Sequence, residues 1–152
     1  MRLTIHTDYA LRMLMLLAIE SGSLHTIDDI ASRYRISRSH LMQIANRLVR
    51  AGFVESVRGR HGGLRLGSVA KSINLGAVVR ATEENFTIAE CFNQQRNACA
   101  ISSVCGLRQP LEEALHAFLA VLDRYSLDDL VRSAATSRRL SRLLSRPDTA
   151  ER

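Results

Sequence analysis

The chain has 152 residues, of which 46% are hydrophobic and 24% charged, so it can bury the core of one domain and is not a disordered polymer. No apolar stretch approaches the roughly 20 residues that a membrane-spanning helix needs. The apolar run at 13–19 has neither the length nor the flanking residues of a signal peptide. We therefore expect a cytoplasmic protein with no membrane partner. The formal net charge is +6, and the segment from Arg33 to Lys71 holds nine basic residues and one acidic residue, which is typical of a surface that binds a polyanion.

The first third of the chain predicts three helices. Thr7 is a suitable N-cap for a helix that runs to about residue 21 and is apolar on nearly all sides, so it is expected to be central in the core. Thr26 caps a short second helix, and Ser37 caps a third helix at about 38–51 with one apolar and one polar, basic face. Two short helices joined by a tight turn form a helix-turn-helix motif.

A β-hairpin is predicted to follow. Residues 53–57 alternate as a strand does, residues 58–63 hold three glycines suited to a reversal, and 64–66 form the returning strand. A fourth helix, capped by Asn74, completes the region. We therefore predict a mainly α fold with a winged helix-turn-helix over residues 1–82.

The predicted DNA-reading surface combines the third helix and the hairpin tip. The first turn of a recognition helix enters the major groove, where Arg can donate to guanine and Gln can pair with adenine. Basic residues of the wing suit the minor groove. Phosphate contact is expected for the two arginines late in the helix, although long Arg stems also cover a protein's own surface. The predicted DNA contacts are Arg38, Ser39, His40, Gln43, Arg47, Arg50, Arg58, Arg60 and His61, the last being equally suited to a simple turn.

The C-terminal part predicts a long helix from about residue 109. Its apolar residues recur at helical spacing, and they form a wider stripe than a small core requires. A dimer interface is favoured over packing against the winged helix, because winged helices that read DNA usually work as two-fold pairs. We assign this long helix and a short following helix, capped by Ser126, to a dimerisation region at 108–134. Residues 135–152 are predicted to form a basic tail with one frayed amphipathic turn near its leucines and a disordered end at 147–152.

All three cysteines, Cys91, Cys99 and Cys105, lie in a polar, irregular loop at 83–107. An odd number of cysteines argues against a disulfide scaffold. Three thiolates suit zinc or an iron–sulfur cluster, each of which usually takes a fourth ligand. The spacing lacks the paired C-x2-C units of zinc ribbons, which favours a cluster; three unligated thiols are the alternative. A carboxylate as fourth ligand would suit a sensor, because it is displaced more easily than a thiolate.

Several segments resemble the winged-helix iron–sulfur regulators, a family that includes IscR, RirA and NsrR. The resemblance covers residues 1–131 and is carried by the opening residues 1–12, by 37–41, by the wing at 57–67 and by the three-cysteine loop. Within the family, residues 90–93, 99–101, 104–108 and 125–130 are most similar to the NsrR branch. IscR-like members carry a histidine three residues after the last cysteine, where this chain has Arg108.

The resemblance implies a homodimeric transcriptional repressor rather than an enzyme. It implies a [4Fe-4S] cluster held by Cys91, Cys99 and Cys105 together with Asp8 of the partner subunit, and it implies that nitric oxide, by attacking this cluster, releases an imperfectly palindromic DNA operator. Two alternatives remain at this point. One is an iron-responsive regulator of the RirA kind with the same ligands, and the other is a zinc-stabilised or thiol-switch repressor without a cluster.

Overall fold

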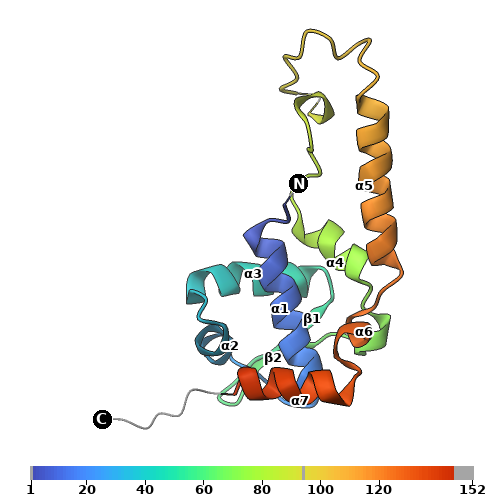
Figure 1. Ribbon diagram of the computed structural model, residues 1–152. Coiled ribbons are helices and arrows are strands. Elements are labelled where there is room, and N and C mark those ends of the chain that lie inside the picture. The colour runs from blue at the N-terminus through green and yellow to red at the C-terminus, as the bar shows by residue number, and fades with distance from the viewer. Residues whose placement is uncertain (1, 94, 146–152) are drawn as a thin grey trace.

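The computed structural model describes residues 2–93 and 95–145. A helical body carries a small hairpin, and one long helix projects from the body beside the irregular segment that precedes it (Figure 1). Among the described residues, no helix combines the length and the apolar composition needed to cross a lipid bilayer. The elements in chain order are α1 (Ile5–Ile19), α2 (Ile27–Tyr34), α3 (Arg38–Arg50), β1 (Val54–Val57), β2 (Gly63–Leu66), the 3-10 turn η1 (Ala70–Ser72), α4 (Leu75–Thr82), the 3-10 turn η2 (Glu90–Phe92), α5 (Arg108–Asp123), α6 (Leu127–Val131) and α7 (Ala134–Leu143).

Side-chain caps begin most of these helices where the sequence predicts them. The side chains of Thr26, Ser37, Asn74 and Ser126 each accept a hydrogen bond from a main-chain amide three residues later. The predicted cap at Thr7 is wrong, because α1 begins at Ile5 and the Thr4 hydroxyl accepts the capping bond from the Thr7 amide. Thr7 itself is completely buried, so its side chain packs inside the body instead of closing the helix end.

The core of the body is built around α1, which contacts α3, α4, α6, α7 and β2. Met13, Leu14 and Leu16 of α1 are fully buried, which explains why this helix is apolar on nearly every side. They share one cluster with Ile30 of α2 and Leu48 of α3. Burying one such side chain stabilises the fold by about 1.5–3 kcal/mol relative to its exposure. The helix-turn-helix therefore sits on a well-filled core.

The predicted hairpin is confirmed and is fastened to the helical body. β1 and β2 pair antiparallel from Val54 opposite Leu66 to Val57 opposite Gly63. Before α2, His25 pairs with Leu64 through two main-chain hydrogen bonds of 3.0 and 2.8 Å. A Cβ atom at Gly63 would lie only 2.9–3.0 Å from the main chain of His25, so this close approach requires glycine. The wing is thus held against the loop between α1 and α2.

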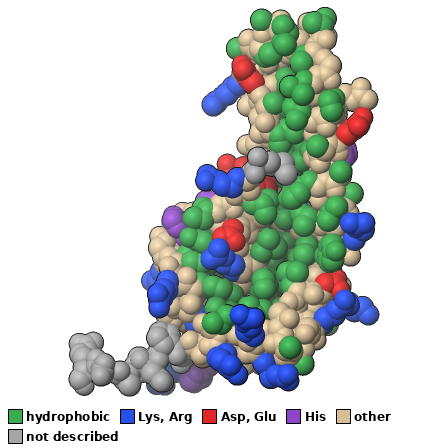
Figure 2. Space-filling model, in the orientation of Figure 1, with side chains coloured by type: hydrophobic (Ala, Val, Ile, Leu, Met, Phe, Trp, Pro, Cys, Tyr) green, Lys and Arg blue, Asp and Glu red, His purple; other side chains and the backbone are tan. Residues whose placement is uncertain are grey.

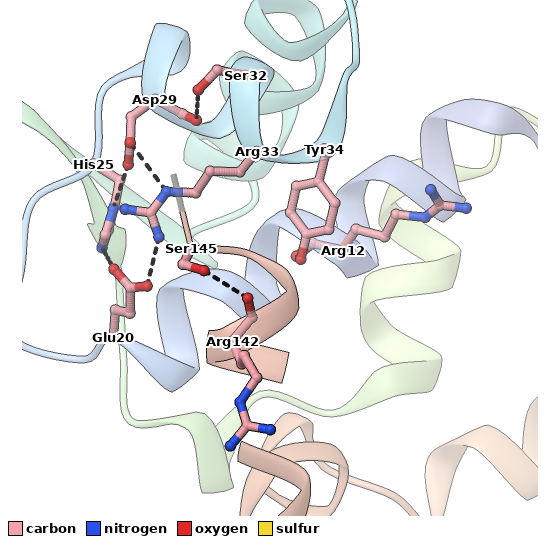
Figure 3. Close-up of polar contacts among 9 residues, drawn as sticks. All are labelled: Arg12, Glu20, His25, Asp29, Ser32, Arg33, Tyr34, Arg142 and Ser145. Atoms are coloured by element: carbon pink, nitrogen blue, oxygen red, sulfur yellow. Dashed lines mark hydrogen bonds and ion pairs between the residues drawn. The ribbon is translucent and has the colours of Figure 1, made fainter. Parts of the chain in front are cut away.

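A buried polar network, which the sequence analysis did not single out, joins the end of α1 to α2 (Figure 3). His25 is only 3% exposed, and its Nδ1 lies 3.0 Å from an Asp29 carboxylate oxygen. Arg33 donates to the other Asp29 oxygen at 3.1 Å and to Glu20 at 2.5 Å. In the neighbouring part of α2, the Tyr34 hydroxyl donates to the Arg12 carbonyl at 2.7 Å, and burial raises the pKa of Tyr34 to about 12.

The basic tail is more ordered than predicted over its first part. Residues 134–143 form α7, which contacts α1 and α6, where the sequence indicates only a frayed turn. Leu144, just after this helix, is 8% exposed and belongs to the core cluster. Tertiary burial of that leucine, which sequence spacing does not reveal, accounts for the additional helix. The expectation of disorder at 147–152 lies outside the described residues.

Candidate nucleic-acid interface and cysteine segment

The recognition helix α3 presents its first turn to solvent. Its buried stripe of Leu41, Ile44, Ala45 and Leu48 faces the core. As a consequence Arg38, Ser39, His40 and Gln43 are all exposed. These are the side chains that the sequence predicts to meet base edges, and the structure places them together on one end of one helix.

Contacts within the chain leave this end of α3 available. Arg38 Nε lies 2.9 Å from Asp28, but the two side chains are 66% and 70% exposed, and such exposed ion pairs contribute only about 0–1 kcal/mol. The His40 ring packs edge-on against the His6 ring of α1, with 6.2 Å between centroids. Arg38 can therefore exchange its carboxylate partner for a base or a phosphate at little cost.

The two arginines late in α3 have different surroundings. Arg50 is exposed. Arg47 is half-buried, and its Nε and Nη2 donate to the main-chain carbonyls of Ala81 and Glu83 at 2.7 and 3.2 Å. In this structure the Arg47 guanidinium is used to bind the end of α4, which leaves part of its hydrogen-bonding capacity for a phosphate.

The wing and α3 border a common groove. Arg58, Arg60 and His61 are exposed at the wing tip, where Gly59 adopts a left-handed φ of +118° that favours glycine. A hollow of about 760 Å³ runs between the two elements and is lined by residues of both, including Asn46 and Arg58. Arg58 of the wing and the middle of the recognition helix therefore line one concave surface.

The cysteine segment forms a lobe at the far end of α5 (Figure 1). Cys91 lies in η2, Cys99 in the following loop and Cys105 shortly before α5, and all three are free and half-buried. The Glu90 carboxylate accepts the Ala98 amide at 2.8 Å, which closes part of the loop.

A metal-binding set is not assembled in the single chain. Over residues 2–93 and 95–145, no group of three or more Cys, His, Asp or Glu side chains is close enough to hold a metal ion. The chemistry of the donors nevertheless fits a thiophilic metal or cluster, because three unbonded thiols occupy one 15-residue segment.

Asp8, the fourth ligand that the resemblance implies, lies in the first turn of α1. Its carboxylate contacts the Arg12 guanidinium at 3.0 and 2.6 Å, and its side chain is 45% exposed. It therefore belongs to the body of the molecule, on a different element from the cysteine lobe, and it remains accessible to a partner.

The long helix α5 has little cover of its own. None of its residues is buried in the single chain, although Leu111, Leu115 and Phe118 are only half-exposed and Val121 is 44% exposed. Figure 2 shows hydrophobic side chains gathered in a band that runs from the cysteine lobe down the molecule beside α5.

The lower end of α5 is fixed to α4 by a charged contact. Arg80 of α4 donates to both carboxylate oxygens of Asp123 at 2.6 and 2.7 Å. These hydrogen bonds lower the pKa of the Asp123 carboxyl below its usual value. The base of the projecting helix is thereby tied to the winged-helix body.

Sequence and structure comparisons agree on the family. A family model described as "Rrf2: Iron-dependent Transcriptional regulator" matches residues 3–133. The chain is 54% identical over 134 residues to the HTH-type transcriptional regulator NsrR of Bacillus subtilis (strain 168), covering 88% of this chain and 92% of that protein. It is 47% identical over 133 residues to Protein aau3 of Rhizobium meliloti (strain 1021), covering 88% of this chain and 86% of that protein.

Solved structures agree as well. The oxidized form of Staphylococcus aureus CymR has a TM-score of 0.69 at 26% identity, covering 88% of this chain and 98% of that chain. T. potens IscR has a TM-score of 0.69 at 23% identity over 87% of both chains, which supports the fold alone. The predicted winged-helix fold and the expectation of a regulator rather than an enzyme are confirmed. The chain belongs to the Rrf2 family of transcriptional regulators.

Proposed function

We propose that the chain is a homodimeric DNA-binding repressor that responds to nitric oxide through an iron–sulfur cluster. The observation that carries the DNA-binding part is the set of exposed side chains in the first turn of α3 and at the basic wing tip, on two elements that border one groove. The name of the Bacillus subtilis relative, an HTH-type transcriptional regulator, supports the same part.

The DNA contacts divide by chemistry. Arg38 and Gln43 supply the donors and acceptors that distinguish bases in the major groove, where each good bidentate pair contributes about 1–3 kcal/mol of discrimination. Arg58 and Arg60 of the wing suit the negative potential of a narrow minor groove. Ser39, His40, Arg50 and His61 complete the surface as contacts to the backbone or to neighbouring bases.

Dimerisation through α5 follows from its lack of cover. A 16-residue helix is about 24 Å long, and most of the stability of a helix in a protein comes from packing of its apolar face. Its apolar stripe, which includes Leu111, Leu115 and Phe118, needs a partner surface beyond the contact with α4. A second copy supplies one, and a two-fold pair would place two α3 helices to read an imperfect palindrome.

Cys91, Cys99 and Cys105, with Asp8 of the partner subunit, are the residues that we assign to a [4Fe-4S] cluster. The three free, half-buried thiols and the accessible Asp8 carboxylate support the assignment, as does the description of the family as iron-dependent. Such a cluster supplies iron with which nitric oxide reacts. The three cysteines lie in the cysteine lobe and Asp8 lies in α1 of the helical body. A cluster bound by both would therefore fasten the cysteine segment of one protomer to α1 of the other.

Iron availability is a second candidate signal, favoured by the family description. It uses the same ligands and the same DNA surface. The two candidates differ only in what removes the protein from DNA. Iron chelation under anaerobic conditions and addition of nitric oxide therefore separate them.

The test uses anaerobically reconstituted chain and a fluorescent duplex selected from a random-sequence pool. We expect tight binding by the reconstituted protein, with log K falling linearly as log salt rises in proportion to the phosphates contacted. Nitric oxide should release the duplex, and a Cys105→Ser variant should hold little iron and bind weakly. Salt-independent affinity, or equal affinity with and without iron, would refute the proposal. Release by a chelator but not by nitric oxide would establish iron as the signal.

A further inference from the structure

The Arg47 side chain has an unexpected position for a residue of the recognition helix. It leaves α3 to donate two hydrogen bonds to the Ala81 and Glu83 carbonyls at the C-terminal end of α4. Carbonyls at a helix end lack partners within the helix and carry partial negative charge, so a guanidinium is a strong ligand for them. The orientation of α3 is thus fixed relative to the end of α4.

Glu83 extends this contact to the start of α1. It is the C-cap of α4 and is 8% exposed. Its Oε1 accepts the Thr4 amide at 2.8 Å and the Thr4 hydroxyl at 3.2 Å. A buried carboxylate is costly unless it is hydrogen-bonded, so these contacts hold Glu83 and Thr4 in one arrangement.

Both routes to the proposed cluster ligands start at this junction. Glu83 is followed by a stretch without helix or strand that leads to Cys91, eight residues later. The Thr4 carbonyl accepts the amide of Asp8 at 3.1 Å in the first turn of α1. Figure 1 shows the N-terminal end of the chain beside the segment that leaves α4.

We propose that the junction of Thr4, Glu83 and Arg47, here called the α3 junction, transmits the state of the cysteine segment and of Asp8 to the recognition helix. The inference rests on the proposed function. A pull on the segment after Glu83, or on the first turn of α1, displaces the carbonyls that Arg47 binds. Gln43 lies one turn earlier on the same side of α3 and moves with Arg47. Arg47 is then a positioning residue for base recognition.

Open space beside the junction allows such a movement. A hollow of about 460 Å³ adjoins the junction and is lined by residues of α1, α3 and α4 and by the residue after Glu83, among them His6, Gln43, Thr82 and Glu84. Tightly packed interiors transmit strain with little freedom to rearrange. An adjoining hollow gives α3 room to shift when its attachment moves.

The test substitutes residues of the α3 junction and keeps the positive charge at position 47, which affects DNA binding. Arg47→Lys retains the positive charge but offers one nitrogen in place of the two that bind the carbonyls. Glu83→Ala removes the carboxylate that accepts from Thr4. Arg50→Lys, an exposed position on the same helix, is the matched control. The first measurement is the ratio of the duplex dissociation constants of cluster-free and reconstituted protein, with folding and dimerisation checked by circular dichroism and sedimentation.

Allosteric ratios are typically about 5- to 150-fold, and we expect a wild-type ratio in that range. Arg47→Lys and Glu83→Ala should bring it close to one with the iron content unchanged, whereas Arg50→Lys should weaken both forms equally and keep the ratio. A merely structural role would lower stability without changing the ratio. If Glu83→Ala does not fold, Arg47→Lys decides the test.

A second readout uses cluster-free protein alone. If the junction couples the recognition helix to the cysteine segment, a saturating duplex should change the exposure of the wild-type cysteines, measured as their rate of alkylation by iodoacetamide. The same duplex should leave that rate unchanged in Arg47→Lys. A wild-type ratio in both junction variants would overturn the junction while the proposed function stands. A wild-type protein whose affinity is the same with and without iron would overturn both.

Discussion

Asp8 forms an ion pair with Arg12 within α1, and we propose that it is also a ligand to the partner's cluster. Asp8→Ala removes both. Arg12→Ala removes the ion pair and keeps the carboxylate. Asp8→Cys removes the ion pair but supplies a thiolate at the ligand position.

The stability cost of the first two variants is expected to be nearly equal. The Asp8 and Arg12 side chains are 45% and 47% exposed, and an i,i+4 pair of this kind contributes about 0.3–0.5 kcal/mol. Loss of an acidic residue from the first turn adds about 0.3–1 kcal/mol for Asp8→Ala. Loss of the Arg12 contact over the Tyr9 ring, at 5.6 Å, adds about 0.5–1 kcal/mol for Arg12→Ala. Both should lose roughly 1 kcal/mol in urea unfolding of cluster-free protein.

The rate of cluster loss should distinguish Asp8→Ala from Arg12→Ala, although the two variants are expected to have nearly the same stability. We expect Asp8→Ala to lose its visible absorption at least about tenfold faster than wild type under anaerobic chelation, a ligand-level effect on metal retention. Arg12→Ala should show a much smaller change, and Asp8→Cys should retain the cluster despite the missing ion pair. Equal rates for Asp8→Ala and Arg12→Ala, or a cluster in Asp8→Cys as labile as in Asp8→Ala, would refute the ligand role.

Three further predictions test other parts of the structure. Gly63→Ala should lower the free energy of unfolding by about 1–3 kcal/mol, because its new Cβ overpacks against the His25 main chain. Gly106→Ala, with no atom within 4 Å of the new Cβ, should be near neutral in the same urea unfolding experiment. Equal costs for the two variants would contradict the attachment of the wing to His25. Because burial raises the pKa of Tyr34 to about 12, the contribution of this residue to stability is complete below pH 10 and is lost as pH rises toward 12. Absorbance at 295 nm should show a late-titrating tyrosine that Tyr34→Phe removes. Val121 of α5 is 44% exposed, and Val121→Glu should leave the circular dichroism unchanged while shifting sedimentation from dimer to monomer. An intact dimer would exclude this face of α5 from the interface.

Local chemistry explains which elements were predictable. Thr26, Ser37 and Asn74 each precede a periodic apolar stripe, and a cap followed by such a stripe determines a helix start with information that lies within a few residues. Thr4 and Thr7 are both residues of the type that caps a helix and both precede the apolar stripe of α1. Only the burial of Thr7 in the assembled core decides that Thr4 is the cap.

The contacts that depend on distant residues were not predictable. Arg47 binds carbonyls 34 and 36 residues away, and Glu83 binds Thr4 across 79 residues, so no spacing rule connects them. The network of His25, Asp29 and Arg33 does carry a signal, because the three residues recur at intervals of four. The cysteines were predicted to act together. The described chain brings them into one lobe, but it does not bring three ligand side chains close enough together to hold a metal ion.

The most direct test is an anaerobic nitric oxide titration of the reconstituted dimer with its fluorescent duplex, followed by visible absorption and anisotropy in the same cuvette. We expect a broad thiolate-to-iron band that bleaches within a few equivalents of nitric oxide per cluster, with anisotropy falling in step as DNA is released. A protein that stays colourless after reconstitution, or a band that bleaches while the duplex remains bound, would contradict the proposed function.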